Sequence, residues 1–342
     1  MTTLTTKKKD LFVQVLRAIA VFSVLIVHTT GYFTSLEFGY MQIVYAFLDS
    51  IANIAVPLFV FVSGYVLTKV YAKGISYPWY YKKRALRIFP AYIFFTTFYF
   101  MFFNYQDLAF KKFLHSMLFA DASYHLPYVL LIFQLYLLFP LLLKINDTKL
   151  LIGSFLVQLV SLLFNSSNIL IFPSFLFYFV LGIYTSKTNI NLLSKLRIPS
   201  NVVIPLILAC LVTYFWIKGS LIFGGFRLIP ESYSWKADIT RYFLYIYLIV
   251  FIFFSRENFM RFFKKAQHFI VKVGNYSFGI YLIHVFYLTL IIRLIFDNQY
   301  GHPLFVVFSL TATFLLSYLS LEVYNKLKDG IKTRVNFRFK LF

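Results

Sequence analysis

The sequence is poor in charge and in the residue patterns that mark a soluble, disulfide-bonded or metal-binding domain. Only 13% of its 342 residues are charged, whereas soluble globular proteins have roughly a quarter. Its single cysteine, Cys210, excludes an internal disulfide and a cysteine-based metal site. It has no Gly-rich phosphate loop, and its six histidines form no metal-ligand motif. ATP-driven and metal-dependent chemistry therefore have no support.

Long apolar runs are abundant instead. Hydrophobic residues make up 60% of the chain and the mean hydropathy is +0.76. Runs that could cross a bilayer as helices occur at 11–33, 42–70, 88–104, 126–143, 150–164, 169–186, 202–218, 239–254, 275–296 and 303–325. The longest segments between them have about twenty residues. The sequence predicts an all-α fold: a polytopic membrane bundle of about ten transmembrane helices, one domain over 1–342 with no soluble extracytoplasmic domain.

The distribution of basic residues predicts the topology. A net charge of +21 would suggest a nucleic-acid partner for a soluble chain, but here the charges lie in short loops, so no nucleic acid is expected. With the N-terminus inside, the inner segments hold 25 Lys and Arg and the outer loops hold 5. This bias predicts a multi-pass protein with both termini cytoplasmic. The basic cluster at 7–9 before an apolar run could mark a signal peptide, but the sequence has no small-residue cleavage site there. The first run is therefore predicted to be a retained span.

Arg17 and His28 lie eleven positions apart inside the first apolar run. Eleven helical residues make three turns plus roughly 20°, so both side chains fall on one face, about 16 Å apart along the axis. Ionisable groups within a membrane span are costly and are often functional. The pair predicts a polar stripe across the membrane. In the structural alternative, Arg17 reaches the nearby headgroups and His28 forms a hydrogen bond inside the bundle.

A second basic motif is KKRALRIFP at 82–90. Arg84 and Arg87 share a helix face at i, i+3 spacing, and Pro90 lies just inside the third span. The motif predicts two guanidinium groups at the cytoplasmic mouth, where they can form bidentate bonds with phosphate. The alternative is an ordinary positive-inside anchor.

The second span contains two further signals. Asp49 and Asn53 lie four residues apart toward its outer end, and a buried carboxylate needs a partner. His28 lies at comparable depth and is one candidate partner. Ser63 and Gly64, in VPLFVFVSGYVL, allow another helix or a ligand to approach the backbone closely.

Three ionisable residues of later spans are also candidates. His125 lies at the outer entrance of the fourth span and His284 lies within the ninth. Each fits either a binding site or a hydrogen-bonded interior histidine. Glu322, near the inner end of the last span, is predicted as a structural partner of Arg84 or Arg87.

Five sequence blocks, in this order, resemble the integral-membrane acyltransferase-3 family, which moves acyl groups onto extracytoplasmic sugars and other envelope acceptors. The family's Arg, ten residues, His block resembles RAIAVFSVLIVH, its Phe-rich Ser-Gly block resembles VPLFVFVSGYVL, and its Arg-x-x-Arg before Ile-x-Pro resembles RALRIFP. The later blocks resemble YHLPYVLLIFQLYLLFP and NYSFGIYLIH. The resemblance covers essentially the whole chain and implies ten spans with both termini inside.

The fourth block departs from the family pattern. Pro127 stands where many members have an aromatic residue, and Gln134 where some have a carboxylate, which weakens a catalytic role for this block. The chain ends at Phe342 and resembles the stand-alone members, including those encoded with exopolysaccharide synthesis machinery, rather than members with an attached esterase-like domain.

The resemblance implies a transmembrane O-acyltransferase of a bacterial cell membrane, with membrane lipids around it and envelope polysaccharide synthesis machinery as a partner. The implied donor is acetyl-CoA or another cytoplasmic acyl-CoA, the acceptor is an extracytoplasmic glycan, and no metal is expected. Arg17, Arg84 and Arg87 would hold the donor's phosphates. The pantetheine arm would then thread between spans and deliver the thioester toward His28.

His28 would take the proton of the acceptor hydroxyl or form an acyl-His28 intermediate. Asp49 or Asn53 would hold its tautomer, and Asp49 is counted with His28 as catalytic. The residues implied on the acceptor side are Asn53, His125 and His284.

Two rival functions remain open from the sequence. In a transporter or flippase for polysaccharide or a lipid-linked sugar, Arg17, His28 and Asp49 would bind substrate or relay protons. A non-catalytic assembly partner in an envelope complex would account for the spans. It would not account for the paired arginines near a polar stripe.

Overall fold

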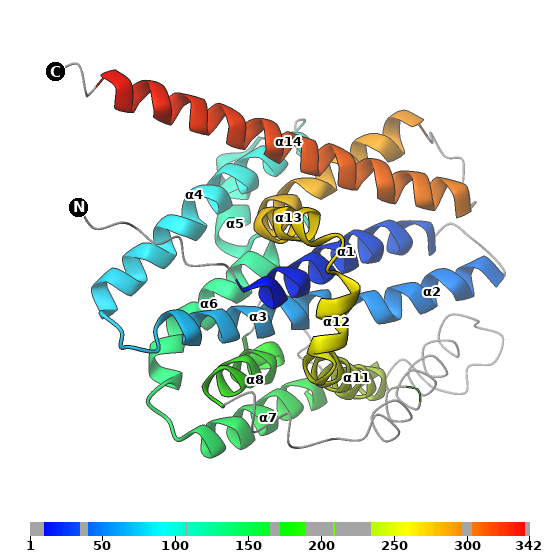
Figure 1. Cartoon of the computed structure of the whole chain (residues 1–342). Coiled ribbons are helices and arrows are strands. Elements are labelled where there is room, and N and C mark those ends of the chain that lie inside the picture. Colours follow the sequence, from blue (N-terminus) through cyan, green and yellow to red (C-terminus); the bar gives the residue numbers. More distant parts are fainter. Residues whose placement is uncertain are drawn as a thin grey trace.

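The computed structural model describes residues 10–34, 40–104, 106, 108–164, 172–188, 208, 234–295 and 303–338. Every regular element within these residues is a helix, which confirms the predicted all-α fold (Figure 1). The helices are α1 (Leu11–Thr34), α2 (Tyr40–Ala52), α3 (Ala55–Val70), α4 (Tyr77–Phe103), α5 (Phe110–Phe119), α6 (Pro127–Leu142), α7 (Asp147–Leu163), the 3-10 helix η1 (Phe172–Phe175), α8 (Leu176–Lys187), α11 (Ser234–Phe254), α12 (Arg256–Phe262), α13 (Gln267–Ile295) and α14 (Pro303–Arg338).

Most of the predicted spans coincide with these helices. Within the described residues, five helical segments are long and apolar enough to cross a membrane, namely Leu11–Tyr32, Val44–Val70, Tyr77–Phe103, Gln267–Leu294 and Pro303–Gly330. Shorter apolar helices occupy Pro127–Leu142 and Ile239–Phe254. The predicted span at 202–218 lies outside the described residues, apart from residue 208. The total of ten spans therefore stays a prediction.

Helix α1 lies at the centre of the bundle, packed between α3 and α13 and covered by α14 (Figure 1). Its apolar residues are buried around most of the helix, for example Phe12, Val15 and Leu25, as expected for a helix that is apolar on all sides. Helix α14 runs antiparallel to α1, so α1 begins and α14 ends on the same side of the bundle (Figure 1).

The predicted second span is divided into α2 and α3 by a turn at Asn53 and Ile54. Pro57 has no backbone N–H, so the carbonyl of Asn53 has no i+4 donor. The Asn53 amide group also donates to the Asp49 carbonyl oxygen at 2.7 Å. A count of apolar residues cannot detect this break, because the run stays apolar through it.

Three other boundaries differ from the predicted spans. Helix α4 begins at Tyr77 rather than at 88, with Pro78 in its first turn, a position that favours helix initiation. The basic motif is therefore part of a helix. Helix α5 lies within the segment predicted as a loop, and α14 continues to Arg338, past the predicted end at 325. Hydropathy detects only the part of a helix that suits the bilayer, so it misses basic and amphipathic extensions.

Helices α3 and α8 approach each other at two glycines. A Cβ atom on Gly64 would collide with the Phe179 carbonyl oxygen, and one on Gly182 would collide with the Phe61 carbonyl oxygen. The predicted close approach at Ser63 and Gly64 is thus confirmed for Gly64, which packs against a helix backbone.

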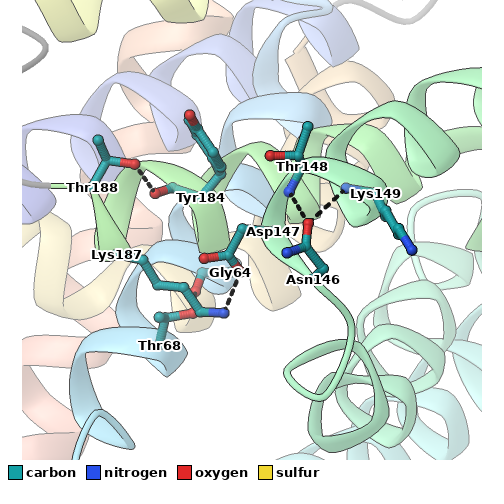
Figure 2. A network of polar contacts seen from close by, with 9 residues as sticks. All are labelled: Gly64, Thr68, Asn146, Asp147, Thr148, Lys149, Tyr184, Lys187 and Thr188. Carbon is teal, nitrogen blue, oxygen red and sulfur yellow. Dashed lines mark hydrogen bonds and ion pairs between the residues drawn. The ribbon is translucent and has the colours of Figure 1, made fainter.

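Polar contacts join the ends of α7 and α8 (Figure 2). The Asn146 side chain caps α7 by accepting from the backbone N–H groups of Thr148 and Lys149. Lys187 at the end of α8 forms an ion pair with Asp147 at the start of α7, at 2.5 Å. These contacts fix one end of the helix pair.

A second ion cluster lies at the start of α1. Asp10 accepts a hydrogen bond from Lys69 of α3 at 2.8 Å and lies 3.5 Å from Arg256 of α12. Burial opposes ionisation of this carboxyl, but the hydrogen bond from Lys69 and the charges of Lys69 and Arg256 hold its pKa below the usual value. Asp10 therefore joins three helices through charge pairs.

Candidate active site

A cavity with about 910 Å³ of empty space lies between α1, α3, α4, α6 and α13. All three predicted donor-binding arginines, Arg17, Arg84 and Arg87, line it. We call it the arginine cavity. Its wall also contains phenol, hydroxyl and amide groups, from Tyr128, Tyr136, Tyr281, Ser63, Ser277 and Asn275.

The positive charge in this cavity is not balanced by acidic residues. No acidic residue is among the described residues that line it. None of the three arginines forms a salt bridge within the described part of the chain. Arg17 and Arg87 lie close enough to repel each other. A low-dielectric site with several unbalanced cations favours a polyanionic ligand.

The prediction that Glu322 pairs with Arg84 or Arg87 is wrong. Glu322 lies 3.4 Å from Lys272 and accepts a hydrogen bond from the Tyr276 hydroxyl at 3.1 Å. All of these groups lie on α13 and α14, which pack side by side. This leaves the arginines without the acid that the sequence suggested for them.

Arg84 and Arg87 differ in their surroundings. The Arg84 side chain is buried, its guanidinium lies about 6 Å from the ring centres of Tyr80 and Tyr136, and its Nε has no partner among the described residues. Arg87 is exposed. Arg84 is therefore a fixed donor held by aromatic rings, while Arg87 can adjust to a ligand at the mouth.

A cluster of three histidines lies farther along the bundle. The rings of His28 on α1 and His284 on α13 stack with centres 5.1 Å apart and planes at 25°. The His125 ring, which precedes α6, meets the His284 ring edge-on at 5.3 Å. Tyr124 contacts His28 at 4.9 Å. The structure thus brings together three of the predicted site residues.

His125 has partners for both ring nitrogens. Its Nδ1 lies 3.0 Å from the Ser123 hydroxyl and its Nε2 lies 3.4 Å from the Leu282 carbonyl oxygen. The Tyr281 hydroxyl donates a short hydrogen bond to the His125 carbonyl oxygen. This pattern is that of a structural histidine, which joins the turn before α6 to α13.

His28 and His284 have incomplete partner sets. The His284 Nδ1–H donates to the Tyr281 carbonyl oxygen at 2.6 Å, while its buried Nε2 has no partner among the described residues. The His28 ring makes no hydrogen bond within the described part of the chain, and its side chain is partly exposed. His28 is therefore the more accessible base, and His284 supports one face of its ring.

Asp49 and Asn53 bind each other rather than His28. The Asn53 amide donates to the Asp49 carboxylate at 2.8 Å. No hydrogen bond joins Asp49 to His28 among the described residues. Asn53 lines a separate cavity, described below. In this geometry Asp49 therefore has no hydrogen bond through which it would orient the His28 ring.

Two tyrosines connect the arginine cavity with the histidine cluster. Tyr281 lines the cavity, and its ring lies 5.8 Å from that of His284. Tyr128 lines the cavity and packs edge-on against Tyr281 at 5.0 Å. Along α1, the predicted rise of about 16 Å separates Arg17 from His28. An elongated ligand fixed at the arginines could extend toward the histidines.

Sequence reasoning did not single out five polar residues of the cavity wall. Tyr128 and Tyr136 lie eight positions apart on α6, and Asn275, Ser277 and Tyr281 lie on α13. The signal was present within the quoted blocks, because residues eight apart fall near one helix face. Identifying which face lines a cavity required the positions of the neighbouring helices.

The acyltransferase domain family matches residues 10–322, nearly the whole chain. Comparisons with curated proteins and with solved structures gave no match. The matched range contains the arginine cavity and the histidine cluster. The chain belongs to the acyltransferase-3 family and is a multi-pass membrane acyltransferase.

Proposed function

We propose that this protein is an O-acyltransferase, in the simplest case an O-acetyltransferase, that takes the acyl group from cytoplasmic acyl-CoA. The acceptor is a hydroxyl group of an extracytoplasmic polysaccharide or other envelope glycan. In this proposal the protein lies in a bacterial cell membrane with both termini cytoplasmic and works beside envelope polysaccharide synthesis machinery.

The observation that carries the proposal is the set of three arginines without acidic partners in one cavity. Coenzyme A is a polyanion, and guanidinium groups form charge-assisted, bidentate bonds with phosphate. The cavity lies near the beginnings of α1 and α4 and the end of α3. The charge bias predicts that these helix ends are cytoplasmic, the side on which acyl-CoA is found.

The path from the arginines to His28 suits a donor with a long, flexible arm. With its phosphates held near Arg17, Arg84 and Arg87, the pantetheine arm would run past Tyr128 and Tyr281 toward the histidine cluster. Holding the thioester beside the acceptor hydroxyl makes the reaction effectively intramolecular.

The proposed reaction needs one base and returns its proton. His28 accepts the proton of the acceptor hydroxyl while the hydroxyl oxygen attacks the acyl carbon. An ester bond forms and the thioester C–S bond breaks. The protonated imidazole then supplies the proton to the leaving thiolate, giving free coenzyme A. His28 is neutral before and after the reaction.

The test uses purified protein in nanodiscs with acetyl-CoA labelled in the acetyl group. Release of free coenzyme A together with labelled acceptor is expected for the wild type and for His268→Ala, in which the replaced histidine is exposed. His28→Ala should release neither product. Binding of acetyl-CoA without any acyl release, combined with glycan movement across the vesicle membrane, would instead establish a transporter.

A further inference from the structure

A second cavity, with about 650 Å³ of empty space, lies where α2 and α3 meet. Its described lining comes from the turn at Asn53, the start of α3, α7, η1, α8 and α11. On α3 it is bounded by Val56 and Pro57, whereas the arginine cavity begins at Phe59. The two cavities therefore follow one another along α3 and have different walls.

The wall of this cavity carries several polar groups. It contains Asn53, Gln158, Ser174 and Arg241, together with the phenol groups of Tyr178, Tyr242 and Tyr245. Polar groups at membrane depth are costly and mark ligand sites or structural networks. The choice between these two depends on how many of the groups are already used within the protein.

Several of these groups serve the fold. Gln158 Oε1 accepts from the Phe177 N–H at 2.8 Å and so caps the start of α8. The Tyr178 hydroxyl donates to the Tyr242 carbonyl oxygen at 3.2 Å, and the Tyr245 hydroxyl to the Ser50 carbonyl oxygen at 3.0 Å. These bonds tie three of the wall's polar side chains to the backbone of neighbouring segments.

One group is not accounted for by the fold. Tyr242 is only 2% exposed, and its hydroxyl has no hydrogen-bond partner among the described residues. A buried hydroxyl without a partner costs free energy, and phenylalanine would fill the same space without that cost. Within the described part of the chain, the hydroxyl is therefore left for a ligand.

The turn at Asn53 also lies at the wall of this cavity. The backbone stays close to helical through it, because Ile54 has φ −60° and ψ −15° and the Leu58 N–H donates to the Ile54 carbonyl oxygen at 2.8 Å. The turn therefore shapes the wall, and the indication of a ligand comes from the Tyr242 hydroxyl.

The combination of groups matches a carbohydrate. A sugar ring presents hydroxyl groups at its edge and an apolar face, and the wall offers amide, guanidinium and phenol groups beside the rings of Phe175, Tyr178 and Tyr242. No acidic residue is among the described residues of the lining. The geometry points to a sugar-binding subsite in the second cavity, which holds a unit of the acceptor glycan away from the reacting hydroxyl.

The identification of the bound sugar as part of the acceptor rests on the proposed function. Sugar binding itself is tested without any acyl donor. Wild-type protein in phosphatidylcholine nanodiscs is titrated with maltotetraose, cellotetraose and chitotetraose, and binding is followed by saturation-transfer NMR. At least one of the three should bind saturably. Tyr242→Phe should weaken that binding by about threefold to tenfold without lowering the unfolding temperature, because the lost hydroxyl has no partner among the described residues.

Tyr92→Phe is the matched control. The Tyr92 hydroxyl donates to the Met117 carbonyl oxygen at 2.7 Å and lies outside both cavities, so this variant should lose stability and keep wild-type sugar binding.

Three results would overturn the inference: no saturable binding of any tetrasaccharide, equal binding by wild type and Tyr242→Phe, or displacement of the sugar signal by phosphatidylglycerol, which would assign the cavity to a lipid headgroup. Failure of the proposed function would give a different result. The protein would then release no coenzyme A from acetyl-CoA, while tetrasaccharide binding and its dependence on Tyr242 would persist.

Discussion

Basic residues in two regions along α1 have opposite surroundings. At the start of the helix, Lys69 and Arg256 share the carboxylate of Asp10. Farther along, Arg17 joins Arg84 and Arg87 in a cavity whose described lining has no acidic residue. The first region is a closed ion cluster that joins helices. The positive charge of the second region is not balanced by its described lining. Of these two regions, it is therefore the one that favours binding of a negatively charged ligand.

The same contrast divides the histidines. His125 has partners for both nitrogens, whereas His28 has none within the described residues and His284 has one nitrogen unpaired. In a membrane interior, where water cannot supply missing partners, a group with a full set of partners is part of the fold. A group without them is available for chemistry.

The largest expected effect is that of His28→Ala on acyl transfer. A general base contributes about 10² to 10⁴-fold, so the rate of acceptor acylation should fall by that factor, while expression and unfolding temperature stay near the wild type. The acceptor polymer should still be made and exported without its acyl groups. Wild-type acyl content on the surface polymer would be incompatible with this role.

His125→Ala should mainly reduce stability. The substitution leaves the Ser123 hydroxyl and the Leu282 carbonyl oxygen without their partner, at a cost of about 1 to 3 kcal/mol. Thermal unfolding of the purified protein should detect this loss, and the activity per folded molecule should change less than for His28→Ala. A stable but inactive His125→Ala protein would show that complete hydrogen bonding does not separate structural from catalytic histidines here.

Arg84→Lys and Arg87→Lys preserve charge and remove the planar donor pair. We expect donor binding to weaken by about tenfold in each case, because one bidentate phosphate contact is replaced by a point charge. Titration with a non-hydrolysable acetyl-CoA analogue in nanodiscs measures this change. Lys69→Arg, in the closed ion cluster, is the control and should bind the analogue as the wild type does.

Asp10→Asn should cost about 0.5 to 1 kcal/mol after allowance for solvent screening. Since the folded-state pKa of Asp10 is lowered, its stabilisation is present above the usual carboxyl pKa and is lost as the pH falls through the lowered value. Unfolding temperatures of wild type and variant should therefore converge in acid. A constant difference at all pH values would point to lost packing instead of lost charge.

The smallest functional effect is expected from cysteines placed to test the orientation. Lys73, between α3 and α4, and Lys111, in α5, are both exposed. In a Cys210→Ala background, an impermeant maleimide on intact cells should label Lys111→Cys and leave Lys73→Cys unlabelled, with activity unchanged in both. The reverse labelling would place the arginine cavity on the outer side and remove the basis for a cytoplasmic donor there.

Much of the arginine cavity could be predicted from the sequence. The spacing of Arg17 and His28 and that of Arg84 and Arg87 specify positions on single helices, and charge predicts which helix ends share one side of the membrane. The apolar run at 11–33 is a strong, local signal for helix α1. The small size of Gly64 correctly indicated a close backbone contact.

The contacts between helices could not be predicted in this way. Any of several helices could have faced His28, and its stacking on His284 depends on α13 lying beside α1. The partner of Glu322 was misassigned for the same reason. The second cavity combines residues from five elements, so no local pattern marks it. Of its lining residues, only Asn53 was singled out from the sequence. Asn53 lies at the turn between α2 and α3, and the continuous apolar run conceals that turn.

The mutual contact of Gly64 and Gly182 also limits how this protein can evolve. Each glycine faces a backbone carbonyl of the other helix, and a backbone atom, unlike a side chain, cannot be trimmed by a compensating substitution. Enlarging either residue would push α3 from α8 as a whole. Since α3 forms a wall of both cavities, a single added methyl group would alter two separate sites at once, and neither site could be tuned by that route independently of the other.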